Sequence, residues 1–129
     1  MKPGLRPGLT SEIEIQVTPE MAPDYEGKVV HPVYSTWSMV HHFEMAARTV
    51  LLPFLEEHEE AVGTHVSADH RAPARIGRAV RIVAKVTEVK GNKIVCDLTA
   101  YARSRVLGYG RQVQAVLPKE RLEELFERS

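Results

Sequence analysis

The sequence contains one long segment with helical periodicity, and the chain after it alternates as strands do. From Ser35 to about Glu60, apolar residues recur at the spacing that places them on one face of a helix. After Gly63 the period changes from 3.6 to 2 residues. Strands and helices do not alternate along the chain, which argues against a doubly wound parallel sheet. The pattern therefore predicts an α+β domain in which one antiparallel sheet covers one helix.

The predicted helix carries its own start and stop signals. Ser35 or Thr36 can cap the first turn, since a short hydroxyl side chain satisfies free amides there. Pro53 should kink or end the regular part, because proline lacks the amide that the helix needs. The apolar stripe of this helix consists of Met39, Val40, Phe43, Ala47, Val50, Leu51 and Phe54.

The remaining segments predict strands and a short terminal helix. Gly91-Asn92 is a two-residue hairpin signal between two alternating runs, and Pro118 opens an amphipathic segment. The order describes a hotdog fold, an antiparallel sheet wrapped around a long central α-helix, with a short C-terminal helix added. We expect one domain, residues 1–129. The predicted strands are 11–18, 64–71, 79–90, 93–105 and 106–117.

Charge and cysteine content exclude several classes of protein. Seventeen Lys and Arg balance seventeen Asp and Glu, which argues against a nucleic-acid-coating protein or a membrane-surface binder. The halves differ, however: residues 1–64 carry a net charge of −6 and residues 65–129 one of +6. An anionic ligand could still contact the second half. Cys96 is the only cysteine, which excludes an intramolecular disulfide and predicts a cytoplasmic location.

Three residues could carry chemistry. Glu44 lies at the edge of the apolar stripe, where it is either a boundary residue or a partly desolvated base. Thr36 lies at the helix start, where it is either a cap or a neighbour of free amides that stabilise an oxyanion. His70 closes a strand-like segment, and a lone histidine is more often structural than catalytic. Position alone favours the structural interpretation of all three residues.

Other kinds of site find little support. The six histidines lack a standard metal-ligand spacing, so we expect no metal and no cofactor. The serines lack a nucleophile-elbow context. Arg71, Arg75, Arg78 and Arg81 form a basic run, which is usually a solvated edge but could also receive the phosphates of a nucleotide-bearing ligand.

The motifs taken together resemble the hotdog thioesterases of the fluoroacetyl-CoA thioesterase type. Thr36-Trp-Ser-Met-Val-His-His-Phe-Glu44 is followed by Gly63-Thr-His-Val-Ser-Ala-Asp-His70 and later by Gly108-x-Gly110. In that family a Thr and a Glu eight residues later lie on the central helix, and a His after a Gly-Thr pair completes the site. The resemblance covers about residues 10–117.

The resemblance implies hydrolysis of an acyl-CoA thioester by Thr36, Glu44 and His70. The carbonyl would lie near the Gly63 backbone and the helix start, at the interface of a homodimer that could assemble further into a tetramer. Glu44 and His70 would activate water or relay protons, with Thr36 assisting them. The residues expected to contact substrate are Tyr34, Trp37, Gly63, Thr64, Arg71 and Arg75.

Two departures from the family pattern leave alternatives open. Gln112 and Gln114 stand where the family has a His and an Arg. The segment before Thr36 lacks the phenylalanines of the fluoroacetyl-specific member, so an ordinary acyl-CoA is the expected substrate. The alternatives are a hotdog enoyl-thioester hydratase, which would also use a His and a carboxylate, and a non-catalytic module that binds acyl groups or small ligands.

Overall fold

The computed structural model describes all residues from Met1 to Ser129. Five long strands and two α-helices account for most of the chain, and two short 3₁₀ turns and a small hairpin lie between them. In chain order the elements are β1 (Thr10–Gln16), η1 (Pro19–Met21), β2 (Asp24–Tyr25), β3 (Lys28–Val29), α1 (Thr36–Leu51), η2 (Leu52–Phe54), β4 (Glu59–His70), β5 (Ala79–Lys90), β6 (Lys93–Ala102), β7 (Arg105–Pro118) and α2 (Lys119–Glu127).

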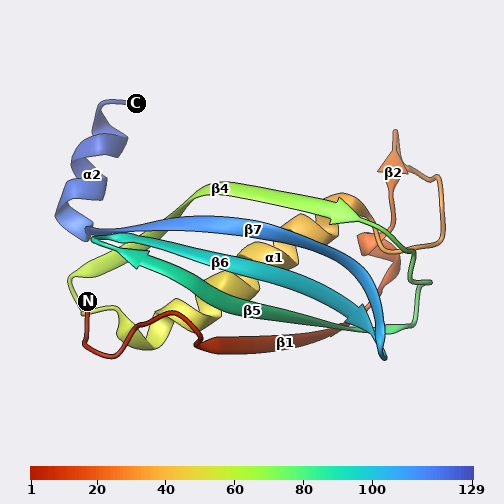
Figure 1. Cartoon of the computed structure of the whole chain (residues 1–129). Coiled ribbons are helices and arrows are strands. Elements are labelled where there is room, and N and C mark those ends of the chain that lie inside the picture. Colours follow the sequence, from red (N-terminus) through yellow and green to blue (C-terminus); the bar gives the residue numbers. More distant parts are fainter.

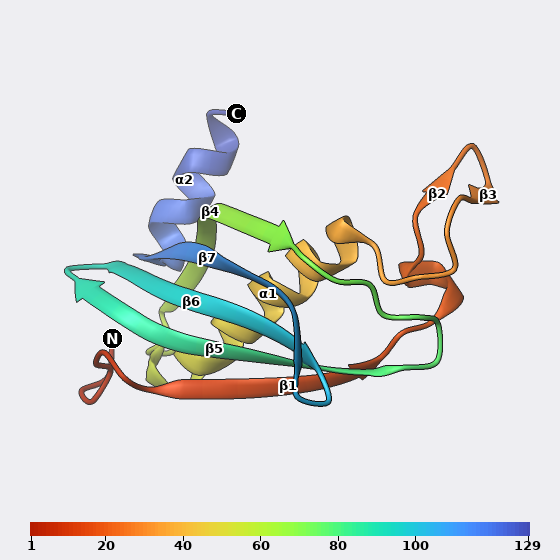
Figure 2. The same cartoon turned by 45° about the vertical axis from the view of Figure 1, so that its right-hand side comes forward.

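The five long strands form one antiparallel sheet in the order β1-β5-β6-β7-β4. Helix α1 crosses one face of this sheet, while α2 and the β2–β3 hairpin project from opposite ends (Figures 1 and 2). This arrangement confirms the predicted α+β hotdog fold with a short C-terminal helix. No helix in the chain combines the length and the apolar character that crossing a bilayer requires.

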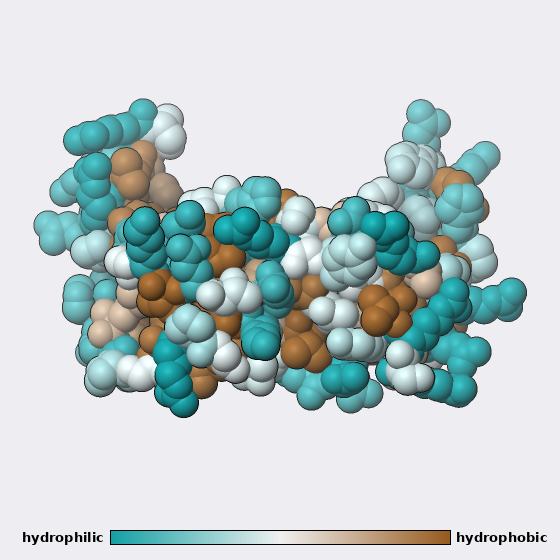
Figure 3. Space-filling model, viewed as in Figure 1, coloured by the Kyte–Doolittle hydropathy of each residue, from teal (hydrophilic) through white to brown (hydrophobic).

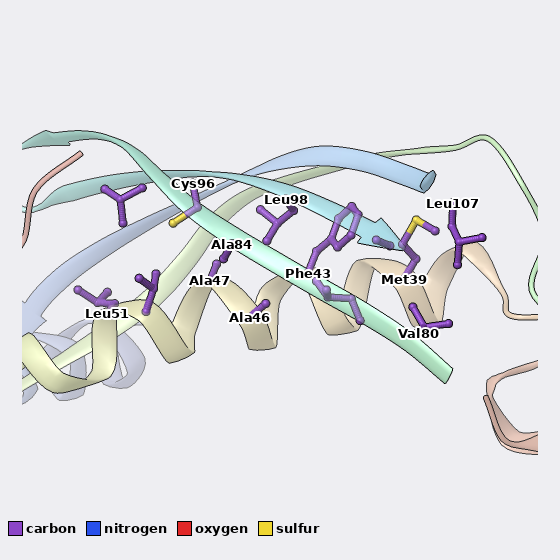
Figure 4. Packing of buried hydrophobic residues seen from close by; sticks show 14 of the residues in the cluster. Met39, Phe43, Ala46, Ala47, Leu51, Val80, Ala84, Cys96, Leu98 and Leu107 are labelled. Carbon is purple, nitrogen blue, oxygen red and sulfur yellow. The ribbon is translucent and has the colours of Figure 1, made fainter. Parts of the chain in front are cut away.

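The hydrophobic core lies between α1 and the sheet. Met39, Phe43 and Leu51 point from the helix toward inward-facing side chains such as Ala84 and Leu98 (Figure 4). Alternate residues of β5 are buried, as the period of 2 predicts for a strand with one covered face. The stripe predicted from the sequence is largely correct, although Val40 and Phe54 are only partly buried and Ala46 belongs to the core.

Two glycines of β7 allow α1 to approach the sheet closely. A Cβ atom on Gly108 would lie 2.6 Å from the backbone oxygen of Asp69 and 2.8 Å from Met39 Sδ. A Cβ atom on Gly110 would collide with the backbone oxygen of Ser67 and lie 3.0 Å from the Phe43 ring. The Gly108-x-Gly110 motif is therefore a requirement of packing at the crossing of helix and sheet.

The predicted helix is too long at its C-terminal end. Helix α1 ends at Leu51, and Pro53 lies in the 3₁₀ turn that follows. Glu59 and Glu60 are the first residues of β4, where the Glu60 carboxylate forms an ion pair of 2.7 Å with Arg48. Glu56 and Glu57 lie in the connection from η2 to β4, and Pro53 ends the regular helix as expected although the helical pattern continues past it.

Strand β4 differs from the others in two respects that concern the site. It is an edge of the sheet, with β7 as its only partner strand. Its register with β7 shifts between Gly63 and His65, which leaves Thr64 as the extra residue of a β-bulge. Bulges are frequent beside active sites, because they redirect side chains and backbone groups locally.

Candidate active site

The first residue of α1 and the last residue of β4 meet through a side-chain hydrogen bond. Thr36 Oγ1 lies 2.9 Å from His70 Nδ1, although 34 positions separate the two residues in the sequence. Ser35 supplies the helix cap, because its Oγ accepts a hydrogen bond from the Ser38 amide at 3.1 Å. With the cap supplied by Ser35, the Thr36 hydroxyl is free to engage the histidine.

Burial controls the charge of His70. It lowers the pKa of the ring below the ordinary histidine value, and contact with the Ala72 backbone opposes this effect in part. Nε2 is buried and has no hydrogen-bond partner, while the Tyr34 ring meets the imidazole edge-on at a centroid distance of 6.3 Å. A neutral imidazole at the N-terminus of a helix can accept or relay a proton at neutral pH.

Tyr34 is fully buried, where its hydroxyl makes a short contact with a second histidine. The phenol oxygen lies 2.6 Å from His42 Nδ1, and the two rings stack at 5.7 Å. Burial raises the pKa of the Tyr34 phenol well above its ordinary value, so the hydroxyl stays protonated. Burial lowers the pKa of His42, as does the neighbouring His41. Tyr34 is thus a structural support behind His70.

The second predicted catalytic group is next to the bulge of β4. A Cβ atom on Gly63 would lie 2.7 Å from Glu44 Oε2 and 3.2 Å from Gln112 Nε2, so a carboxylate and an amide converge above this glycine. These residues belong to a hollow of about 290 Å³. The Glu44 side chain is exposed at the hollow. The hollow is lined by His41, Glu44, Met45, Arg48, Ala61, Gly63, Gln112 and Gln114.

Gln112 and Gln114 project from β7 beneath this hollow. Both are almost completely buried, each with 2% of its surface exposed. Gln114 Nε2 donates a hydrogen bond of 3.0 Å to the Ala47 carbonyl, whereas Gln112 Oε1 has no partner. An unpartnered buried amide oxygen is unfavourable, which makes Gln112 a polar group available for a bound molecule or water.

Within one chain the two groups of residues remain apart. Thr36 and Glu44 lie on the same helix, and eight residues at about 1.5 Å each separate them by about 12 Å along its axis. His70 accompanies Thr36, while Gly63 and Gln112 accompany Glu44. The chain therefore presents a Thr–His pair and a separate carboxylate beside a glycine.

Thr64 and Trp37, which were also predicted to contact substrate, have different surroundings. Thr64 is exposed in the bulge and donates a long hydrogen bond of 3.4 Å to the Val113 carbonyl. Trp37 is 46% exposed and meets the Tyr25 ring edge-on at 5.8 Å. The indole follows directly on Thr36, so an apolar surface formed by these two rings borders the Thr–His pair.

The structure separates the two arginines that were predicted to contact substrate. Arg71 donates a hydrogen bond of 2.8 Å to the Tyr109 hydroxyl, and its guanidinium lies over that ring. Arg75 lies beyond the bend at Pro73, where it lines a different, larger groove. No cluster of three or more His, Cys, Asp or Glu side chains is arranged to hold a metal ion.

The amide contribution to the hollow does not follow from the sequence motifs. The two glutamines were noted only as departures from a family pattern, and His41 and Arg48 were not considered as lining residues. The available signal was the alternation along the strand. Gln112 and Gln114 are separated from Val116 by even numbers of positions, so their side chains face inward with it.

Comparisons with known proteins identify the family of this chain. The family model described as fluoroacetyl-CoA-specific thioesterase matches residues 17–120. A fluoroacetyl-CoA thioesterase of Streptantibioticus cattleyicolor is 28% identical over 89 residues, which are 69% of this chain and 64% of that protein. The chain thus matches less than two thirds of the length of this curated relative.

Two solved structures share the fold. A hypothetical protein of Thermus thermophilus, described as a thioesterase superfamily member, is 42% identical with a TM-score of 0.93, covering 98% of this chain and 93% of the other. A hot-dog-like protein of Thermanaerovibrio acidaminovorans has a TM-score of 0.87 at 24% identity, covering 95% and 91%, and supports the fold alone. On the family match, which spans most of the chain, this protein belongs to the fluoroacetyl-CoA-specific thioesterase family.

Proposed function

We propose that this protein hydrolyses an acyl-CoA thioester to the free acid and CoA, with Thr36, Glu44 and His70 as the catalytic residues. The observation that carries the proposal is the 2.9 Å contact between Thr36 and His70 at the N-terminus of α1. Membership of a thioesterase family supports the reaction class. The lack of phenylalanines before Thr36 favours an ordinary acyl group over fluoroacetate.

The proposed mechanism uses what each group offers chemically. The first amides of α1 have no intrahelical acceptor, and the helix dipole adds positive potential, so this end can stabilise the developing oxyanion. The neutral His70 ring relays a proton, with Thr36 fixing its orientation. The Glu44 carboxylate positions and deprotonates water above Gly63, whose missing side chain leaves the space. The resulting hydroxide attacks the thioester carbonyl carbon, and collapse of the tetrahedral intermediate breaks the C–S bond, so that CoA leaves as the thiolate and the acid remains.

The expected site residues require a second copy of the chain. Strand β4 offers a free edge of 12 residues, and one chain keeps Glu44 about 12 Å from Thr36 along the helix. Figure 3 shows a concave surface above this edge, between α2 and the β2–β3 hairpin. Exposed apolar side chains flank it, namely Tyr25, Val29, Val30, Leu125 and Phe126.

We therefore propose a homodimer that pairs β4 strands across a two-fold axis and surrounds the thioester with groups from both copies. A tetramer of two such dimers remains part of the proposal. The free, buried Cys96 supports a reducing, cytoplasmic location. Sedimentation should give at least twice the chain mass, and a monomer at micromolar concentration would contradict the dimer.

The experiment that tests the reaction is a thiol-release screen over short, branched and aryl acyl-CoA thioesters. His70→Ala and Glu44→Ala should each reduce kcat/KM by at least about 100-fold, the usual scale for general acid–base groups. His58→Ala and Glu57→Ala are the matched controls, because both side chains are exposed outside the site. Unchanged rates in both site variants would refute the assignment, and loss of enoyl absorbance without thiol release would indicate hydration instead.

A further inference from the structure

A second hollow, larger than the Glu44 hollow, lies away from it and is lined by arginines. Its volume is about 880 Å³, within the range of small-molecule sites. Three segments form it: the loop from β4 to β5, the turn between β6 and β7, and the end of β1, which meet at one end of the sheet (Figure 2). Its charged lining consists of Arg75, Arg78, Arg81, Arg103, Arg105 and Glu14.

The register of the strands places this arginine groove on the face opposite α1. Glu14 pairs with Arg81 across β1 and β5, and Arg81 pairs with Tyr101 across β5 and β6, so the three side chains share one face. The neighbouring Ile82 and Ala100 are buried against the helix on the other face. The groove is therefore separate from the hollow that holds Glu44.

Most of the positive charge in the groove is unneutralised. Arg81 forms an ion pair of 2.9 Å with Glu12 and lies over the Tyr101 ring at 4.6 Å. The other four arginines form neither an ion pair nor a side-chain hydrogen bond, in a chain whose total charge is zero. Guanidinium groups match phosphate oxygens with two parallel donors each, so such a concentration is suited to several phosphate groups.

The backbone beneath the arginines is held firmly. The Val17 amide donates to the Arg78 carbonyl at 2.8 Å, and the Gly77 amide donates to the Val17 carbonyl at 2.7 Å. The Ile76 amide donates to the Pro32 carbonyl at 3.1 Å. The backbone of this wall is therefore fixed before any ligand binds, which limits the backbone entropy lost on binding.

We propose that the arginine groove binds the phosphate groups of a phosphorylated adenine nucleotide. Two sources share this chemistry: the 3′-phosphorylated ADP portion of a CoA thioester, and a free nucleotide that binds independently of the substrate. The first source rests on the proposed function. The loop that carries Arg75 is joined to the residues just before Thr36, because Arg75 forms a β-bridge with Val33 and the Tyr34 amide donates to the Ala74 carbonyl at 2.8 Å.

The test measures nucleotide binding without any hydrolysis. Calorimetric titration with ADP, 3′-phosphorylated ADP and adenosine should detect binding of the two phosphorylated probes and weaker or no binding of adenosine. The double variant Arg78→Ala, Arg105→Ala should weaken that binding at least tenfold. Arg128→Ala, which removes an exposed arginine from the C-terminal end, is the matched control and should bind as the wild type does. Absence of binding to the wild type, or equal binding to the double variant, would overturn the proposal.

A second measurement separates the two sources. If the groove holds the nucleotide of CoA, the double variant raises KM for an acyl-CoA at least tenfold and leaves the hydrolysis of the same acyl-pantetheine thioester unchanged. If the groove holds a free nucleotide, the variant loses binding while both KM values stay the same. If the protein binds nucleotide but hydrolyses neither thioester, the proposed function is contradicted, whereas nucleotide binding by the arginine groove is supported.

Discussion

Two regions where α1 faces the sheet differ in what fills the space left by a glycine. At the closed region, Gly110 of β7 faces the backbone of Ser67 and the Phe43 ring. At the open region, Gly63 of β4 faces the ends of two polar side chains, the exposed Glu44 and the buried Gln112. The first approach is set by packing against backbone, whereas the second brings polar groups together where we propose that the chemistry occurs. The same residue type thus has a structural role in one region and a proposed functional role in the other.

The largest effect is expected at the closed region. Gly110→Ala places a methyl group against a neighbouring strand that cannot move aside, so we expect the free energy of unfolding to fall by about 3 kcal/mol. Urea denaturation at a fixed protein concentration measures this change. A variant as stable as the wild type would show that the crossing of helix and sheet tolerates expansion, and the distinction between the regions would disappear.

The matched substitution at the open region should reduce the reaction rate while leaving stability nearly unchanged. Gly63→Ala places its methyl group 2.7 Å from Glu44 Oε2, and the carboxylate can swing away because its side chain is exposed and flexible. We expect a stability loss below about 1 kcal/mol, since surface changes are usually small. The rate of thioester hydrolysis should fall between about 10- and 100-fold, because the proposed catalytic carboxylate of Glu44 would be displaced from its geometry. Equal rates for variant and wild type would remove Gly63 from the site.

The fold could be predicted from the sequence because apolar and polar residues recur at regular intervals. The strand from Ala79 to Lys90 was predicted with its observed boundaries, since apolar and polar residues alternate between Pro73 and the Gly91-Asn92 turn. The expectation that Pro53 ends the regular helix is confirmed, whereas the helical segment as a whole was drawn too far, into the connection to β4. Local signals decide where an element ends, and here the proline outweighed the pattern.

The site was only partly predictable from sequence. The Thr36–His70 contact depends on where β4 ends relative to the helix start, and the convergence on Gly63 depends on the bulge at Thr64. Neither follows from residue spacing, because both are set by strand register. Arg71 and Arg75 are close in sequence, but the bend at Pro73 sends them to different surfaces.

The smallest effect concerns how the stability of the protein depends on pH. Each of the two regions holds one histidine, and burial lowers the pKa of both. His42 lies in the closed interior against Tyr34, and His70 lies beside Thr36 at the open side. Below the ordinary pKa of 6.5, the unfolded chain takes up protons that the folded protein does not. Stability therefore rises with pH in this window and is lost as the pH falls from 6.5 through the lowered values. Melting temperatures measured from pH 7.5 downward should decrease accordingly.

The variant His42→Asn separates the two histidines. An asparagine oxygen can accept the hydrogen bond of the Tyr34 hydroxyl near the position of Nδ1, and it takes up no proton. The variant should lose part of the acid sensitivity of the melting temperature. The midpoint of the acid limb in the pH profile of kcat/KM should stay below pH 6.5, because His70 remains and burial lowers its pKa. If the variant instead shifts the rate limb and leaves the melting profile unchanged, the buried histidine belongs to the chemistry, and the division between a closed structural region and an open reactive one is wrong.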